Sequence, residues 1–296
     1  MTARDLVLPS FFGDALALGP HWVYDPPKIA GWYAGGIRSY DAPRSTYHPG
    51  KVAGDFTHYG DQTLALLESL AADDGSLINW PTDWRRWAEH VRDERTSYFD
   101  GATRGTLENF TAGETEPSDS HDLGGASRIA PLFAFTRDVG QLVPLARTQT
   151  ALTHGDPQVI DAAEFFARAA LSVAGGAGFE EAFDEAASHP YDALPAIDWV
   201  TLGRDAAAGE LAAQAGELGL GCGVEGAFPI TLAVAFRHEA DPVEALSANA
   251  MLGGDSAARG MLLGLLMGAR HGLAAFPVKW RKELRSIETI ERLLPQ

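Results

Sequence analysis

The sequence contains only one cysteine, Cys222, among its 296 residues. A single cysteine excludes an intramolecular disulfide framework and a cysteine-based metal cluster. Because scarce, unpaired cysteine suits a reducing compartment, we expect a cytoplasmic protein. Basic residues are also scarce, since 23 Lys and Arg stand against 40 Asp and Glu, a net charge of −17. This charge argues against nucleic acid or an anionic membrane as a partner.

Long apolar runs and strand patterns are missing as well. The longest apolar run, MLLGLLMGA at 261–269, is too short to span a bilayer. We expect no signal peptide, because Asp14 interrupts the apolar N-terminal stretch. No stretch shows the sustained alternation of a β-sheet. The composition, 46% hydrophobic and 21% charged, is typical of a globular protein.

Helical periodicity is what the sequence has in abundance. In residues 156–174, Asp156 is placed to cap a helix and Pro157 occupies its first position. Apolar residues then recur at spacings of three and four, and similar patterns elsewhere predict about twelve helical segments. No internal repeat or composition break divides the chain. The sequence therefore predicts one all-α domain over residues 1–296.

Four glycines recur every fourth residue near the C-terminal end, at Gly260, Gly264, Gly268 and Gly272. In a helix this spacing places them on one face. Each interior glycine costs roughly 1 kcal/mol relative to alanine, so a close neighbour must compensate. We favour tight helix packing, with direct approach of a ligand as the alternative.

Carboxylates stand where several helices are predicted to begin. Such acids cap helices and complement the helix dipole, which is one reading of Asp61 and Asp255. The other reading is a hard-cation site, because Thr63 and Ser256 stand beside them and Mg²⁺ prefers carboxylate and hydroxyl oxygens. The acidic segment 113–122 is interpreted as a mobile surface loop.

Histidines and common catalytic motifs give weaker signals. His154 in LTHGDP could be a ligand, a base or a buried histidine bonded to a carbonyl, and we favour the last for it and for His21 and His58. No H-x-x-H or H-E-x-x-H spacing occurs, so we expect no histidine-rich zinc site. No nucleophile elbow, Walker loop or dinucleotide fingerprint is present.

Six segments in order resemble the ADP-ribosylglycohydrolase family, and especially its branch similar to the J-type jellyfish crystallins. They are GDALALG (13–19), HYGDQTLALLESL (58–70), DGATRGTLENF (100–110), GGASRIAPL (124–132), LTHGDPQVIDAA (152–163) and GGDSAARGMLLGLLMGARHG (253–272), the last followed by FPVKW (276–280). The resemblance implies an all-α, single-domain orthogonal helical bundle with a cleft.

The resemblance also implies a chemistry. In active members the cleft holds two Mg²⁺ or Mn²⁺ ions and an N- or O-glycosidic bond of an ADP-ribosyl group is hydrolysed. Carried over to this chain, it makes Asp100 the catalytic base. It gives substrate binding to Asp14, Thr103, Arg128 and His154, and metal binding to Asp61, Gln62, Thr63, Asp255 and Ser256. Asp61 and Asp255 should then share one cleft, bordered by Asp100 and His154.

Two positions depart from the family pattern. Gln62 and Ala257 stand where active members carry acids, and two neighbouring dications need negative ligands to offset their repulsion. We therefore expect a weakened site with one Mg²⁺ or Mn²⁺ ion or none. The predicted function is hydrolysis of an ADP-ribosyl or related ribosyl compound, small or attached to a protein. The alternatives are a non-catalytic protein that binds an ADP-ribose-like ligand and a crystallin-like structural protein. The oligomeric state stays open.

Overall fold

Several helices in the computed structural model begin where a side chain satisfies one of the first backbone amides. As predicted, Asp156 caps α8 (Pro157–Ala174) by accepting from the backbone N–H groups of Gln158 and Val159. Asp100 caps α5 (Gly101–Ala112) in the same way, with Thr103 N–H as its donor. These caps fix the directions in which the helices leave the loops.

The structure describes residues 1–295, and these form sixteen α-helices and two 3₁₀ helices without a β-strand. The predicted all-α class is confirmed. The remaining elements are α1 (Ala3–Ala17), α2 (Pro26–Trp32), α3 (His58–Ala72), α4 (Trp80–Glu94), α6 (Gly124–Ser127), η1 (Ala130–Ala134), α7 (Val139–Ala151), α9 (Phe179–Ala187), α10 (Ala196–Ala208), α11 (Leu211–Leu218), α12 (Val224–Arg237), α13 (Pro242–Leu252), α14 (Ser256–His271), η2 (Leu273–Ala275), α15 (Val278–Glu283) and α16 (Ile287–Leu293).

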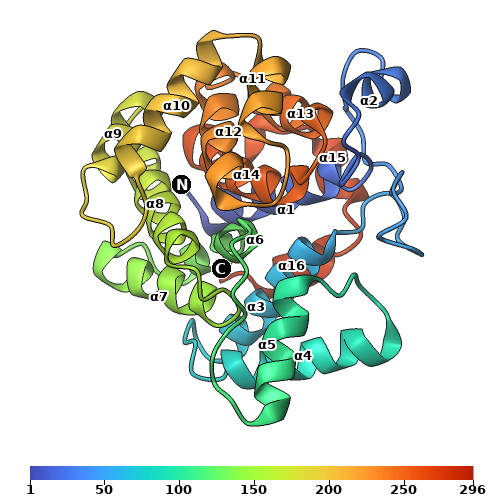
Figure 1. The fold of residues 1–296 in the computed structure, drawn as a ribbon, viewed down its shortest axis with the longest axis vertical. Coiled ribbons are helices and arrows are strands. Elements are labelled where there is room, and N and C mark those ends of the chain that lie inside the picture. Colours follow the sequence, from blue (N-terminus) through green and yellow to red (C-terminus); the bar gives the residue numbers. More distant parts are fainter. Residues whose placement is uncertain (296) are drawn as a thin grey trace.

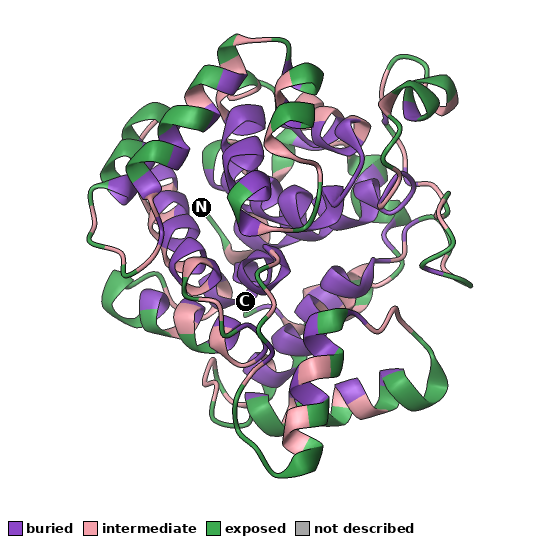
Figure 2. Cartoon of the chain, in the orientation of Figure 1, coloured by how far each residue is buried: buried purple, intermediate pink, exposed green. Residues whose placement is uncertain are grey.

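Two helices from opposite ends of the chain, α1 and α14, pack together at the centre (Figure 1). Both are buried along most of their length, with α8 and α12 against other sides of α14 (Figure 2). A Cβ atom on Gly260, Gly264 or Gly268 would lie between 2.0 and 2.7 Å from a backbone oxygen of α1. The predicted tight packing is therefore confirmed for these three. Gly272 instead ends α14 with a φ of +70°.

A long irregular segment, residues 33–57, connects α2 to α3. Residues that follow η2 hold it in place. The indole N–H of Trp280 donates to the carbonyl of Arg38 over 3.0 Å, and the backbone N–H of Arg285 donates to the carbonyl of Gly54 over 3.0 Å. The C-terminal end of the chain thus positions a loop that lies next to the start of α3. No described helix is long and apolar enough to cross a bilayer.

Candidate functional site

Asp14 anchors the start of α3. From its fully buried position on α1, its carboxylate accepts hydrogen bonds from the Thr57 N–H (2.8 Å), the Thr57 hydroxyl (2.6 Å) and the Gly60 N–H (3.2 Å). Burial raises the pKa of Asp14 to about 7, although the hydrogen bonds from Thr57 oppose the rise. Its substrate-binding role stays a prediction, because all its contacts here are with the protein.

Gln62 on α3 joins two buried charged groups. Its side-chain amide donates to Asp100 Oδ2 and to Thr103 Oγ1, each over 3.1 Å. Its Oε1 accepts from Arg128 Nη1 over 2.7 Å. Burial raises the pKa of Asp100 and lowers that of Arg128 to about 10. The structure thus brings four of the predicted site residues into one network.

The same network continues to His154. Arg128 Nη2 donates to Thr153 Oγ1 (2.6 Å), and Thr153 Oγ1 lies 2.8 Å from His154 Nδ1. His154 Nε2 lies 2.9 Å from Asp122 Oδ1. His154 is buried as predicted, but its partners are a hydroxyl and a carboxylate rather than a carbonyl. Burial by itself would raise the pKa of Asp122, yet the nearby His154 holds it below its ordinary value.

Asp122 also corrects the interpretation of segment 113–122 as a surface loop. Residues 113–116 are exposed, but Ser118 is buried and its N–H donates to Thr106 Oγ1 over 2.9 Å. The segment forms bridges with His154 and Gly223. Ser118 and Asp122 therefore join the buried network while Asp119 and His121 stay exposed, because a hydrophilic composition does not exclude satisfied buried contacts.

Asp61 and Asp255 have no partner in common. Asp61 Oδ2 forms an ion pair with Lys51 Nζ (2.6 Å) and accepts from the Ser97 hydroxyl. Asp255 Oδ2 accepts from the Tyr59 hydroxyl over 2.9 Å, and the Asp255 carboxylate makes no capping hydrogen bond to α14. That these two carboxylates share one metal site stays a prediction, and among the described residues they occur together in no metal-sized cluster of three or more His, Cys, Asp or Glu.

The donor set that the resemblance assigned to two hard cations does not fit them. Asp61 is neutralised by Lys51, both ends of the Gln62 amide are occupied, and Thr63 Oγ1 donates to the carbonyl of Tyr59 over 2.8 Å. Ser256 Oγ is buried without a partner. Ala257 lies in an apolar cluster. These residues supply too little free negative oxygen for two Mg²⁺ or Mn²⁺ ions.

A cluster of three histidines lies beside the network. His21 follows α1, His48 belongs to segment 33–57 and His58 begins α3, and all three are buried. One ring nitrogen of each lies within 4.8 Å of the others, and His48 Nε2 is 3.2 Å from His58 Nδ1. Asp100 Oδ2 lies 3.5 Å from His58 Nε2, and Asp255 Oδ1 lies 3.7 Å from His21 Nδ1. We call these three residues the histidine cluster.

Trp22 covers the histidine cluster. Its ring stacks on His21 with 4.6 Å between centroids and lies 5.1 Å from the His58 centroid. The φ of Trp22 is +58°, a strained conformation for a bulky residue. The strain is held by its N–H, which donates to the carbonyl of Gly254 over 2.8 Å, while the Gly254 N–H donates to the carbonyl of Val23 over 2.9 Å.

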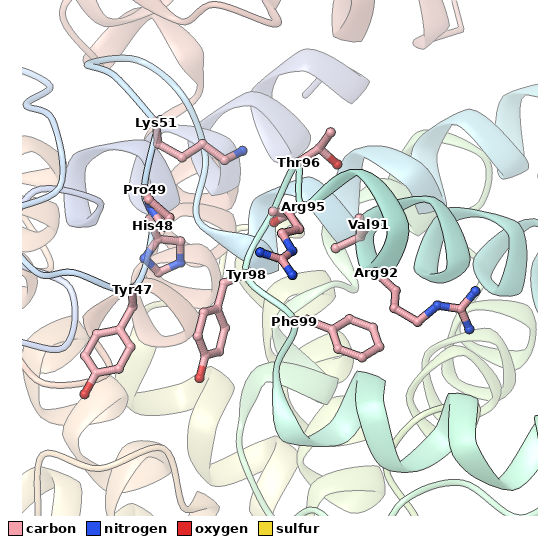
Figure 3. A pocket seen from close by; sticks show the side chains of 11 residues that line it. Tyr47, His48, Pro49, Lys51, Val91, Arg92, Arg95, Thr96, Tyr98 and Phe99 are labelled. Carbon is pink, nitrogen blue, oxygen red and sulfur yellow. The ribbon is translucent and has the colours of Figure 1, made fainter.

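A pocket of about 350 Å³ opens onto His48 (Figure 3). Its walls carry the aromatic rings of Tyr47, Tyr98 and Phe99 and the cations of Lys51, Arg92 and Arg95, together with Pro49, Val91, Thr96 and Ser97. No carboxylate is among these lining residues, although the whole chain has a net charge of −17. Lys51 is paired with Asp61 and Arg92 with Asp93, so the pocket combines flat apolar surface with one cation, Arg95, that has no ion-pair partner among the described residues.

The comparisons with known proteins agree with this architecture. The family model described as ADP-ribosylglycohydrolase matches residues 2–296. The chain belongs to the ADP-ribosylglycohydrolase family. A solved structure described as "ADP-ribosylglycohydrolase-related protein complex" is 25% identical, with a TM-score of 0.70 over 98% of this chain and 95% of that chain. No curated protein matches the sequence. Family membership supports a hydrolase of this fold.

Sequence reasoning missed several residues around the site of this family member. His48 and Tyr98 stand in irregular segments without periodicity, and Asp122 stands in a segment interpreted as exposed. The histidine cluster was not predicted, because its members are far apart in sequence and show no H-x-x-H spacing. The only available signal was that His21, His48 and His58 each stand near one of the first two family motifs.

Proposed function

We propose that this ADP-ribosylglycohydrolase family member hydrolyses an N- or O-glycosidic bond of a ribosyl compound that carries phosphate, using an altered metal site. The pocket over His48 carries the proposal. Arginine and lysine recognise phosphate, and tyrosine rings stack on a nucleobase. An ADP-ribosyl group, small or attached to a protein, presents both features. The residues do not fit a pair of hard cations.

Asp100 is the proposed catalytic base. It is buried at the start of α5, and its Oδ2 faces Nε2 of His58 in the histidine cluster. Another member of that cluster, His48, lines the pocket. Burial raises its pKa, which brings a carboxylate closer to the operating pH that general base catalysis favours. Thr103, Gln62 and Arg128 position it through the network.

The proposal extends to the branch of the family, the location and the domain organisation. The segments GDQT (60–63) and GGDSAARG (253–260) support placement of the chain in the branch similar to the J-type crystallins. The single cysteine supports a cytoplasmic location. We also propose that residues 1–296 form one domain. Binding of an ADP-ribose-like ligand without turnover is the alternative that the experiment below separates.

The experiment is calorimetry with ADP-ribose on the wild type and on Arg95→Glu. Reversing a charge in the pocket should weaken binding at least about tenfold, which corresponds to about 1.4 kcal/mol. Arg85→Glu is the matched control, because Arg85 lies on α4 outside the pocket and pairs with Glu89. Equal weakening by both variants, or no binding by the wild type, would contradict the assignment of the pocket.

Turnover is measured separately as release of ribosyl product. Hydrolysis of ADP-ribosyl-arginine and ADP-ribosyl-serine should be absent or very slow, with or without Mg²⁺, because the family's metal acids are replaced at Gln62 and Ala257. Other phosphorylated N- and O-ribosyl compounds are then assayed, and Asp100→Asn should abolish any release. Fast Mg²⁺-dependent turnover by the wild type would overturn the altered site. Binding without release from any compound would favour the alternative.

A further inference from the structure

The histidine cluster contains buried nitrogens without partners. Four of these nitrogens are shielded from solvent and make no hydrogen bond. They are both ring nitrogens of His21, Nδ1 of His48 and Nε2 of His58. The exposed fraction of each residue is 2% or less. Buried polar atoms are normally satisfied, because leaving one unpaired costs free energy. Both nitrogens of one ring, His21, lack a partner, so the protein groups alone do not satisfy this buried cluster.

We propose that His21, His48 and His58 together bind one divalent transition-metal ion of the zinc class. Three imidazoles are the protein ligands of one type of catalytic zinc site, which leaves a further position open. No residue of this trio belongs to the set that the resemblance assigned to metal. Binding of the ion is independent of the proposed function, since it can be measured without any substrate.

The distances suit a shared ion. With Zn–N bonds of about 2.0–2.1 Å, two ligands at a tetrahedral angle lie roughly 3.3 Å apart. His48 Nε2 and His58 Nδ1 are 3.2 Å apart, and the third ligand atom lies within 4.8 Å of both. Coordination would bring a His21 nitrogen to a similar distance from the other two ligand atoms. A hydrogen bond between His48 and His58 explains the first distance too, but it leaves both nitrogens of His21 without a partner.

The charge state of the rings favours ligands over bases. Burial lowers the pKa of His48 to about 2 and that of His58 to about 3, and it lowers the pKa of His21 well below its ordinary value. Neutral imidazoles offer a lone pair at neutral pH without releasing a proton. The arrangement of the rings, with one nitrogen of each within 4.8 Å of the others, suits the cluster to coordination.

Two carboxylates lie behind the rings. Asp100 faces Nε2 of His58, and Asp255 faces Nδ1 of His21. In the proposed site these are the nitrogens that do not bind the ion. Ligating histidines commonly direct their other N–H to a carboxylate, which fixes the tautomer and orients the ring. A dication would also balance the charge of these two buried carboxylates.

Imidazole nitrogen selects the metal. It suits Zn²⁺, Cu²⁺, Ni²⁺ and Fe²⁺, whereas Mg²⁺ and Mn²⁺ are held mainly by oxygen. The test therefore uses Zn²⁺ and Co²⁺ on the full chain, freed of any affinity tag and stripped by a chelator. Calorimetry should show one Zn²⁺ per chain, and an excess of Mg²⁺ should not displace it. Bound Co²⁺ should give the visible absorption of a nitrogen-ligated, four-coordinate site.

Variants separate the cluster from other histidines. His48→Ala should weaken Zn²⁺ binding by about a hundredfold or more, and Asp255→Asn by about ten- to a hundredfold through the orientation of His21. His90→Ala, an exposed histidine on α4, is the matched control and should bind Zn²⁺ normally. Circular dichroism confirms that each variant is folded.

The outcomes decide the proposal. It is overturned if the wild type binds neither ion, or if His48→Ala and His90→Ala bind alike. If His48→Ala does not fold, the wild-type Co²⁺ spectrum still decides, because a site made of surface carboxylates and waters is six-coordinate and almost colourless. Zinc binding without turnover on any ribosyl compound supports this inference and rejects the proposed function. If the protein hydrolyses a ribosyl compound without zinc and also binds no zinc, the result supports the proposed function and rejects this inference.

Discussion

At the scale of single residues, Gln62 shows why this site departs from its family. The Gln62 amide donates to Asp100 and accepts from Arg128, so one neutral side chain satisfies two buried charged groups. A carboxylate at this position could accept from Arg128 but could not donate to Asp100, and two acids would then face each other. The residue that the family resemblance places at a metal-ligand position is therefore the one that completes the buried network.

Asp14 gives a prediction about pH. Burial raises its pKa to about 7 from 3.8, so between about pH 4 and 7 the native state binds a proton that the unfolded chain has released. This contribution to stability is present at low pH and is lost as pH rises through 7. The two pKa values differ by the equivalent of about 4 kcal/mol. The cost of Asp14→Asn should therefore fall by about 3 kcal/mol from pH 5 to pH 8.

The measurement is denaturant unfolding of both proteins at several pH values. Two nearby charges shift the pKa of Asp14 in opposite directions: Asp61 raises it and Lys51 lowers it. Asp138→Asn is the control for loss of a capping carboxylate, since Asp138 is exposed at the start of α7. A cost of Asp14→Asn that is constant or grows with pH would show that Asp14 is ionised in the native protein.

At the scale of elements, the contact between α1 and α14 depends on glycine. A Cβ atom on Gly264 would lie 2.0 Å from the carbonyl oxygen of Pro9, so α1 would have to move. Gly264→Ala should cost about 3 kcal/mol or more, the upper part of the range for overpacking. The midpoint of thermal unfolding should then fall by several degrees.

Gly216→Ala is the matched control for the glycine prediction. Gly216 lies in α11, and a Cβ atom added there meets nothing within 4 Å. This change should stabilise the protein by about 0.5–1 kcal/mol, because alanine favours the helix and restricts the unfolded chain. Thermal unfolding followed by circular dichroism compares the two variants. If Gly264→Ala is neutral or stabilising, the two helices are not in backbone contact in solution.

The histidine cluster is also a property of elements rather than of one motif. The turn after α1, the irregular segment 33–57 and the start of α3 each contribute one ring. A Cβ atom on Gly253 would lie 2.3 Å from the carbonyl oxygen of Val23, and the φ of Gly253 is +70°. The glycines of GGDSAARG thus hold the turn that carries His21 and Trp22.

At the scale of the whole molecule, the two ends of the chain share one core. Helices α1 and α14 pack together, and α16 packs against α3. We therefore predict that the chain unfolds in a single transition. Far-UV circular dichroism and tryptophan fluorescence should give coincident curves, since the seven tryptophans are spread from residue 22 to residue 280. Two separate transitions would show that the chain contains more than one independently unfolding unit.

The distribution of charge is a second property of the whole molecule. The chain has 40 acidic residues, yet none lines the pocket beside His48. An acidic surface repels a phosphorylated ligand at long range, so the cations of the pocket must act locally. Short-range recognition of this kind depends on the geometry of the contacts more than on long-range electrostatic attraction of the ligand.

The sequence by itself determined the helical class, the family and the start of several helices. Apolar periodicity identifies a buried helix face, and Asp156 and Asp100 cap helices through hydrogen bonds to residues two or three positions away. The row of glycines in α14 could also be interpreted from the sequence, because glycines at a regular spacing on one helix face indicate a close neighbour. All of these follow from interactions that are local along the chain.

Only the tertiary structure decided which group each carboxylate meets. Asp61 and Asp255 both stand at helix starts, but segment 33–57 brings Lys51 to the first and α3 brings Tyr59 to the second. The same packing gathers three histidines that share no motif. These pairings depend on how loops close over helix ends across long stretches of chain, and no local pattern encodes that closure.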